Sequence, residues 1–172
     1  GRTYDWVVLD DITSPNFTVK VRISDTRDYE ARDDSDNPFK IKGDFIVGYP
    51  NGAEQLRVGE QCTITWTTIG TIPTVKLEYF YNSTWTTIAP SVANTGSYTW
   101  PVPDKITLPP SDYSVLIRVS DTRDTSVTND TSDSGFKVKA NITVVYPNGN
   151  EELEVDTDVQ ITWTVVGTVP EV

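Results

Sequence analysis

Hydrophobic and polar residues alternate along several stretches of this chain, which is the pattern of β-strands that bury one face. Val75, Leu77 and Tyr79 stand at every second position, with Lys76 and Glu78 between them. The stretches with this pattern are residues 17–23, 62–67, 75–81 and 113–119. Shorter strands are expected near residues 39–41, 45–49, 54–58, 84–88, 97–102 and 136–138.

The number and spacing of these strands predict the fold class. Polar turn residues recur every eight to twelve positions, and Val, Ile, Thr, Tyr and Trp are plentiful, which is typical of an all-β protein without helices. Seven or eight strands fall within about 97 residues. That count predicts a two-sheet β-sandwich of the immunoglobulin or fibronectin type III kind, with a closed barrel as the alternative.

Several motifs occur twice in the chain at a nearly constant offset of 94 to 97 residues. The clearest are Tyr-Pro-Asn-Gly at 49–52 and 146–149, Ile-Thr-Trp-Thr at 64–67 and 161–164, and Ser-Asp-Thr-Arg-Asp at 24–28 and 120–124. A fixed period of this length indicates a tandem array in which each repeat unit forms one sandwich.

The period predicts how the chain is divided. Residues 1–44 match the C-terminal half of a repeat unit, residues 45–141 a complete unit, and residues 142–172 the N-terminal half of the next unit. The two incomplete units are complementary halves. We therefore expect them to contact another copy of the chain or adjacent repeats of the same chain.

Taken together, the motifs resemble a known family. They follow one another in the order Tyr-Pro-Asn-Gly, Ile-Thr-Trp-Thr, Gly-Ser-Tyr-Thr-Trp-Pro-Val-Pro at 96–103, Tyr-Ser-Val-Leu-Ile-Arg-Val at 113–119, and Phe-Lys-Val at 136–138. This order resembles the yeast Ser-Thr-rich GPI-anchored cell-wall family, whose fibronectin-like domains also recur in tandem in large surface proteins. The resemblance implies a secreted or surface-exposed module without catalytic residues. These residues include neither the Ser/Thr-rich tail nor the anchor signal of the fungal members, which leaves the attachment open.

Charge and composition narrow the choice of partners. The net charge is −11, so the chain repels nucleic acid and anionic membrane surfaces. No run of 18 apolar residues is present, and we expect any leader or anchor to lie outside these residues. Cys62 is the single cysteine, and Val159 takes its place in the other repeat, which favours a small buried hydrophobe over a reactive thiol.

The residue types present argue against an enzyme. The chain has no histidine, which excludes a Ser-His-Asp triad and a histidine metal site, and a single cysteine excludes a thiolate zinc cluster. A pair of carboxylates of the glycosidase type is formally possible, but nothing singles out two of them. No catalytic residue is therefore predicted.

Clustered aspartates make calcium the candidate cofactor, because this cation prefers six to eight oxygen ligands. The candidate ligands are Asp25, Asp28, Asp33, Asp34 and Asp36 in one loop region and Asp121, Asp124, Asp130 and Asp133 in its repeat. Arg27 and Arg123 lie inside the same motifs and would neutralise two carboxylates. The alternative is a turn closed by side-chain to backbone hydrogen bonds.

Two further kinds of site are candidates. The sequons for N-glycosylation begin at Asn16, Asn82, Asn129 and Asn141. Phe80 and Trp85 are candidate stacking platforms for a sugar ring, because alternation places Phe80 on the face opposite to Leu77. A second sheet or a domain interface would bury the same rings.

These observations predict an extracellular, cell-surface or cell-wall structural module that forms a stalk or filament by self-association. The alternative is a carbohydrate-binding or adhesin module that recognises cell-wall or host glycans. Glycan binding lost on Trp85→Ala would distinguish the second function from the first.

Overall fold

The computed structural model describes residues 1–9, 14–104 and 112–169, and these residues form strands, turns and loops without a helix. The strands are β1 (Ser14–Val19), β2 (Arg22–Ser24), β3 (Arg32–Asp34), β4 (Phe39–Ile41), β5 (Asp44–Tyr49), β6 (Gln55–Arg57), β7 (Gln61–Ile69), β8 (Thr74–Tyr81), β9 (Thr84–Ala93), β10 (Ser97–Pro101), β11 (Leu116–Asp121), β12 (Asn129–Thr131), β13 (Lys137–Lys139), β14 (Asn141–Tyr146) and β15 (Thr162–Val166). The predicted all-β class is therefore confirmed.

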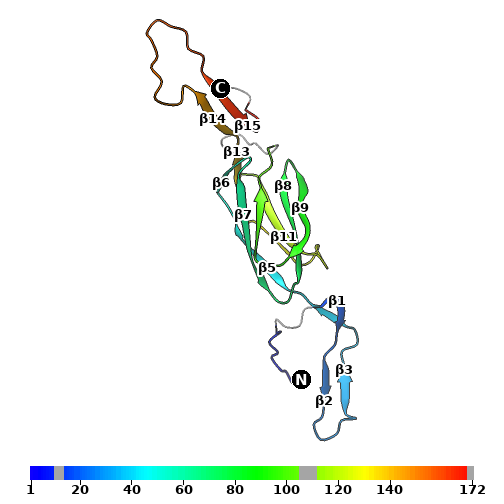
Figure 1. Cartoon of the computed structure of the whole chain (residues 1–172). Coiled ribbons are helices and arrows are strands. Elements are labelled where there is room, and N and C mark those ends of the chain that lie inside the picture. The colour runs from blue at the N-terminus through cyan, green and yellow to red at the C-terminus, as the bar shows by residue number, and fades with distance from the viewer. Residues whose placement is uncertain (10–13, 105–111, 170–172) are drawn as a thin grey trace.

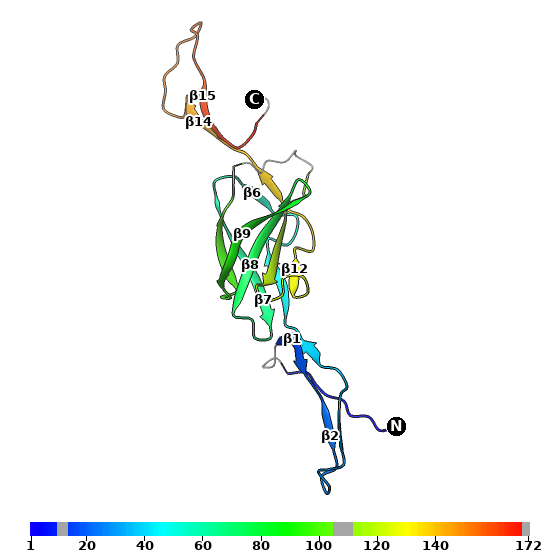
Figure 2. The ribbon, with the colours of Figure 1, turned by 90° about the vertical axis from the view of Figure 1, so that its right-hand side faces the viewer.

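The strands lie in three parts along an elongated molecule. A first segment (β1 to β4) and a last segment (β14 and β15) lie at opposite ends of a central sandwich (β5 to β13), as both views show (Figure 1 and Figure 2). The central sandwich corresponds to the repeat unit that the sequence predicts to be complete. Among the described residues, the hydrophobic core cluster lies in this part of the molecule.

Two antiparallel sheets form the central sandwich. One has the strand order β10-β7-β5, and the other has the order β12-β11-β8-β9. Strand β13 adds to β6 in parallel, with Val138 opposite Leu56. A backbone-to-side-chain hydrogen bond also joins the two sheets, from the Val47 amide to Asp130 Oδ2 at 2.7 Å. This is the immunoglobulin and fibronectin III-like arrangement that the strand count predicts.

Alternating residues from both sheets fill the space between them. The fully buried side chains include those of Ile64 on β7, Leu77 on β8 and Ile117 on β11. Tyr79 and Trp100 pack ring against ring across the core, with centroids 5.4 Å apart. Cys62 is also buried in this core, and burial raises the pKa of its thiol to about 11. The thiol is thus protonated and apolar, as the comparison with Val159 predicts.

Strand β9 is longer than the predicted strand over residues 84–88. Its pairing with β8 shifts in register between Val75 and Leu77 and again between Leu77 and Glu78. Each shift inserts an irregularity that interrupts the alternation of apolar and polar positions. Pro90 also lies within this edge strand. The pattern therefore hides the second half of β9, although that half pairs as a strand.

The last segment repeats the local structure of β5 and β7. Val47 pairs with Trp66 in the central sandwich, and Val144 pairs with Trp163 in the last segment, with a register shift immediately after each valine. The two copies differ in the exposed fraction of their tryptophan side chains. Trp66 is 5% exposed and Trp163 is 44% exposed. The last segment thus has the strand pairing of β5 and β7 without a covering sheet.

The first segment carries equivalents of the strands that end the central sandwich. Val19 lies opposite Phe39, as Val115 lies opposite Phe136. Apolar residues of this segment are again uncovered, since Ile23 is 74% exposed whereas its counterpart Val119 is fully buried. Assignment of the two segments to further sandwich units stays a prediction.

Candidate functional site

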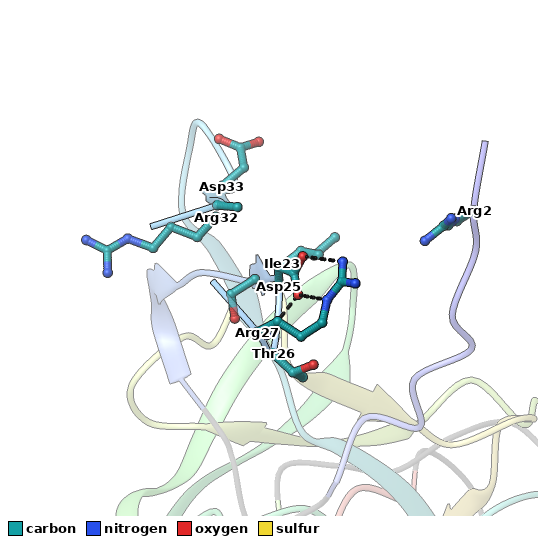
Figure 3. A pocket seen from close by; sticks show the side chains of 9 residues that line it. Arg2, Ile23, Asp25, Thr26, Arg27, Arg32 and Asp33 are labelled. Atoms are coloured by element: carbon teal, nitrogen blue, oxygen red, sulfur yellow. Dashed lines mark hydrogen bonds and ion pairs between the residues drawn. The ribbon is translucent and has the colours of Figure 1, made fainter. Parts of the chain in front are cut away.

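The Ser-Asp-Thr-Arg-Asp motif folds into the same closed turn in both of its copies. Asp25 Oδ1 accepts a hydrogen bond from the Arg27 amide at 2.9 Å, and the guanidinium binds the same carboxylate, with Nη2 and Oδ2 3.0 Å apart (Figure 3). Asp121 and Arg123 repeat these contacts at 2.9 and 2.7 Å. Hydrogen bonding to the guanidinium of Arg27 lowers the pKa of the Asp25 carboxyl. The predicted side-chain to backbone turn is confirmed.

The turn of the first segment borders a hollow of about 620 Å³. The Asp25–Arg27 pair lies on one side and Arg2 of the N-terminal stretch lies on the other, while Arg32 and Asp33 point away from the pair (Figure 3). Ile23 also lines the hollow, at a position whose counterpart is buried in the central sandwich. The hollow therefore lies where the central sandwich has part of its core, but here no second sheet covers it.

Most of the other candidate calcium ligands already have partners in the protein. Asp34 binds Arg22, with Oδ2 2.9 Å from Nη2, and Asp124 binds Lys40 at 2.8 Å. Asp133 Oδ2 accepts a hydrogen bond from the Asn51 side-chain amide at 2.8 Å. Asp130 is bonded to β5 as described, and Asp28 Oδ1 accepts a hydrogen bond from the Glu30 amide at 3.1 Å.

These contacts separate the aspartates instead of bringing them together. Across residues 1–9, 14–104 and 112–169, no group of three or more acidic, His or Cys side chains is arranged to hold a metal ion. A calcium ion would have to displace Arg27 or Arg123 to reach Asp25 or Asp121. Calcium binding stays a prediction, and the geometry supports the role of these aspartates in turns and ion pairs.

Phe80 and Trp85 lie together on the outer face of the β12-β11-β8-β9 sheet. Their ring centroids are 5.3 Å apart, and the guanidinium carbon of Arg118 lies 4.0 Å from the centre of the Trp85 ring. Arg118 also binds Glu78, with Nη2 and Oε2 2.6 Å apart. One face of the Trp85 ring is therefore covered by a cation of the protein itself, which limits the ring area that a sugar can reach.

A second aromatic surface, which the sequence did not single out, lies between the free edges of the two sheets. A groove of about 290 Å³ runs there, and its lining has aromatic rings and hydroxyl groups but no charged side chain. The lining residues are Tyr79, Thr86, Thr87, Ile88, Tyr98, Trp100, Pro101 and Pro103. The groove arises because β9 and β10 end their sheets on the same side, which strand pattern alone does not reveal.

The sequons differ in the surroundings of their asparagines. Asn82 is exposed at the tip of the β8–β9 hairpin, with a φ of 49°. Asn129 is held in place, because its amide nitrogen donates to the Thr125 carbonyl at 2.9 Å. Asn141 is half-buried at the start of β14, and Asn16 is exposed in β1. Asn16 and Asn82 are thus the exposed asparagines of the four sequons, and glycosylation stays a prediction.

A protein-family model matches the central part of the chain. The model for the Kre9/KNH-like N-terminal Ig-like domain matches residues 49–134, which is 86 of the 172 residues. The matched range lies within the central sandwich, from the end of β5 to the loop before β13. The Ig-like domain implied by the sequence resemblance is therefore confirmed, whereas Ser/Thr richness and a GPI anchor lie outside what this match describes.

Comparison with solved structures gives a fibronectin-like neighbour. This neighbour is the structure of the fibronectin(III)-like modules of CbhA from Clostridium thermocellum, which are 15% identical to this chain. The match covers 55% of this chain and 94% of the CbhA chain, with a TM-score of 0.35. A comparison with curated proteins returns no match. The described part of the chain also offers no helix that is both long and apolar enough to cross a bilayer.

Proposed function

Because this chain belongs to the family of Kre9/KNH-like N-terminal Ig-like domains, we propose that it is a non-catalytic structural module of an extracellular, cell-surface protein. We further propose that copies of the chain associate end to end into a stalk or filament. The observation that carries the second proposal is the exposure, in the first and last segments, of apolar residues whose counterparts form the core of the central sandwich.

The central sandwich shows which surfaces cover one another in a complete unit. The stretch that runs from β5 to β7 contacts the stretch that runs from β10 to β13. Strand β7 pairs with β10, β6 pairs with β13, and the Ser132 hydroxyl donates to the Pro50 carbonyl at 2.8 Å. Asn51 and Asp133 add two hydrogen bonds, of 2.8 and 2.7 Å. These contacts join parts of the unit that are far apart in sequence.

The last and first segments carry the counterparts of these two stretches. Asn148 corresponds to Asn51, and Asp36 corresponds to Asp133, both at an offset of 97. Val144 on the last segment is 45% exposed and Ile23 on the first segment is 74% exposed, whereas their counterparts Val47 and Val119 are buried in the core of the central sandwich. The last segment of one copy therefore fits the first segment of a second copy in the same way, and their contact would bury apolar area on both sides.

Cross-linking tests this association at a chosen contact. In a Cys62→Val background, one copy carries Asn148→Cys and another carries Asp36→Cys, and a short bifunctional thiol reagent is added to the mixture. We expect a product of two chains. A single chain with both Asn51→Cys and Asp133→Cys is the positive control, because the same reagent should link these positions within the central sandwich.

An added substitution separates docking from random collision. Val144→Asp in the Asn148→Cys copy places a charge on the apolar face and should abolish the product. Absence of a two-chain product while the positive control reacts would show that the segments do not dock, and it would overturn the proposal of self-association. The assignment as a structural Ig-like module would be unaffected.

The uncharged groove between β9 and β10 favours carbohydrate binding as a second candidate function. Stacking on Tyr98 and hydrogen bonds to Thr86 and Thr87 suit a neutral sugar ring. A glycan array probed with the native chain, Tyr98→Ala and Trp85→Ala tests this candidate. Loss of binding in Tyr98→Ala alone would assign it to the groove, loss in Trp85→Ala alone would assign it to the outer face, and no binding by the native chain would contradict it.

A further inference from the structure

An ion pair joins the first segment to the central sandwich. Lys40 Nζ on β4 lies 2.8 Å from Asp124 Oδ2 in the loop after β11. Their side chains are only 20% and 19% exposed. The two residues are 84 positions apart in sequence, and the contact crosses the junction between two parts of the molecule. An ion pair with this degree of burial is screened by salt less than a fully exposed pair.

The lysine is held in position by an aromatic ring. Lys40 Nζ lies 5.4 Å from the centre of the Phe17 ring on β1, which pairs with β4. The same arrangement recurs one repeat later, where Lys137 Nζ lies 5.9 Å from the centre of the Tyr113 ring. A cation held over a ring loses less conformational freedom when it meets a carboxylate.

The carboxylate of Asp124 is also held in an orientation that suits the contact with Lys40. Asp124 Oδ1 accepts a hydrogen bond from the Ser126 hydroxyl at 3.0 Å, which leaves Oδ2 for Lys40. The Asp124 carbonyl accepts the Thr128 amide at 3.1 Å and so closes the loop. Arg123 anchors the loop further, because its guanidinium binds Asp121 and donates to the Thr71 carbonyl at 3.0 Å.

We infer that the last aspartate of the Ser-Asp-Thr-Arg-Asp loop is the docking point for the lysine of the preceding repeat unit, and that this contact fixes the direction in which one unit follows another. The first aspartate of the motif has a different role, because it closes the turn with arginine. The motif therefore combines a rigid turn with an acceptor aimed at the neighbouring unit.

Distance measurements between spin labels test the contact within the chain. In a Cys62→Val background, labels at Glu30→Cys and Ser91→Cys report on the tilt of the first segment against the central sandwich. Since domains move relative to one another unless a contact fixes them, Lys40→Gln should broaden the distance distribution by roughly twofold. The charge swap Lys40→Glu with Asp124→Lys should restore the narrow distribution.

Two controls make the result specific. Asp28→Asn changes the equivalent aspartate of the loop that lies away from the junction, and it should leave the distribution unchanged. The melting temperature of the central sandwich should also be unchanged in Lys40→Gln. An unchanged distribution in Lys40→Gln, or a charge swap that fails to narrow it in a folded chain, would overturn the docking role.

Discussion

At the scale of single residues, two glutamates close the same turn in different parts of the molecule. Glu54 accepts hydrogen bonds from the Asn51 and Gly52 amides at 2.9 and 2.7 Å. Glu151 accepts the equivalent bonds from the Asn148 and Gly149 amides at 2.7 and 2.6 Å. The turn is thus specified locally and forms even where no second sheet covers it.

Replacement of Glu54 should destabilise the central sandwich. Glu54→Ala leaves two half-buried backbone amides without their charged acceptor, which costs about 2 kcal/mol of unfolding free energy. Chemical denaturation followed by the fluorescence of buried tryptophans measures this cost. Glu151→Ala is the matched control, and it should leave the unfolding midpoint of the central sandwich in place. Equal loss in both variants would contradict a local role.

Glu78 forms ion pairs with two cationic side chains on the outer face of the larger sheet. It is 5% exposed, and it binds Lys76 Nζ and Arg118 Nη2, each at 2.6 Å. Burial on its own would raise the pKa of the Glu78 carboxyl, but the hydrogen bonds from Lys76 and Arg118 outweigh burial and lower it. The carboxylate is therefore charged and paired in the folded protein.

The direction of this shift predicts how stability depends on pH. The unfolded chain takes up the proton at Glu78 more readily than the folded chain does, so the stabilisation is complete above the ordinary pKa of 4.5 and declines as the pH falls below it. Glu78→Gln should lower the free energy of unfolding at pH 7 by about 2 kcal/mol. In this variant the free energy of unfolding should also decrease less steeply as the pH falls below the ordinary pKa of the Glu78 carboxyl. Denaturant unfolding at a series of pH values measures both effects, and an unchanged slope would contradict the assignment.

At the scale of elements, β7 and β15 compare one strand with and without a covering sheet. Trp66 on β7 is buried and donates from Nε1 to the Asn94 side-chain oxygen at 2.7 Å. Asn94 in turn donates to the Ile72 carbonyl at 2.8 Å. Trp163 takes the same place on β15 but is 44% exposed. The strand sequence is thus shared, and packing is what differs.

Matched tryptophan substitutions in the two strands should lower the free energy of unfolding by very different amounts. Trp66→Ala removes a buried ring and a hydrogen bond, which should cost about 3–5 kcal/mol. Trp163→Ala should cost less than about 1 kcal/mol in the isolated chain, because its ring is already exposed to solvent. Thermal unfolding of both variants at low protein concentration provides the measurement. A large cost for Trp163→Ala under those conditions would show that β15 is covered in solution.

The alternation of apolar and polar residues predicted some of the strands but not all of them. Alternation identified β7, β8 and β11 because each has one face in the core, and it missed the end of β9 because register shifts break the alternation. In the candidate sites, the turn of Asp25 and Arg27 was predictable because its partners are two residues apart. The contact of Lys40 with Asp124 was not, because the pairing of distant segments depends on tertiary packing.

At the scale of the whole molecule, the net charge of −11 opposes association of copies. Because salt screens this repulsion and strengthens burial of apolar area, end-to-end association should become stronger between about 0.05 and 0.5 M salt. Sedimentation at equal protein concentration measures the average mass. Val144→Asp should remain monomeric at both salt concentrations. A mass that falls with salt would show that attraction between charges dominates the contact.

Strand β9 limits the directions in which such an assembly can grow. It is the free edge of its sheet, but two register shifts break its hydrogen-bonding pattern, and Pro90 brings no backbone N–H. An edge of this kind is a poor template for a strand of a neighbouring chain. Lateral pairing of chains along β9 would therefore be disfavoured, and a polymer of this protein would not widen through this edge.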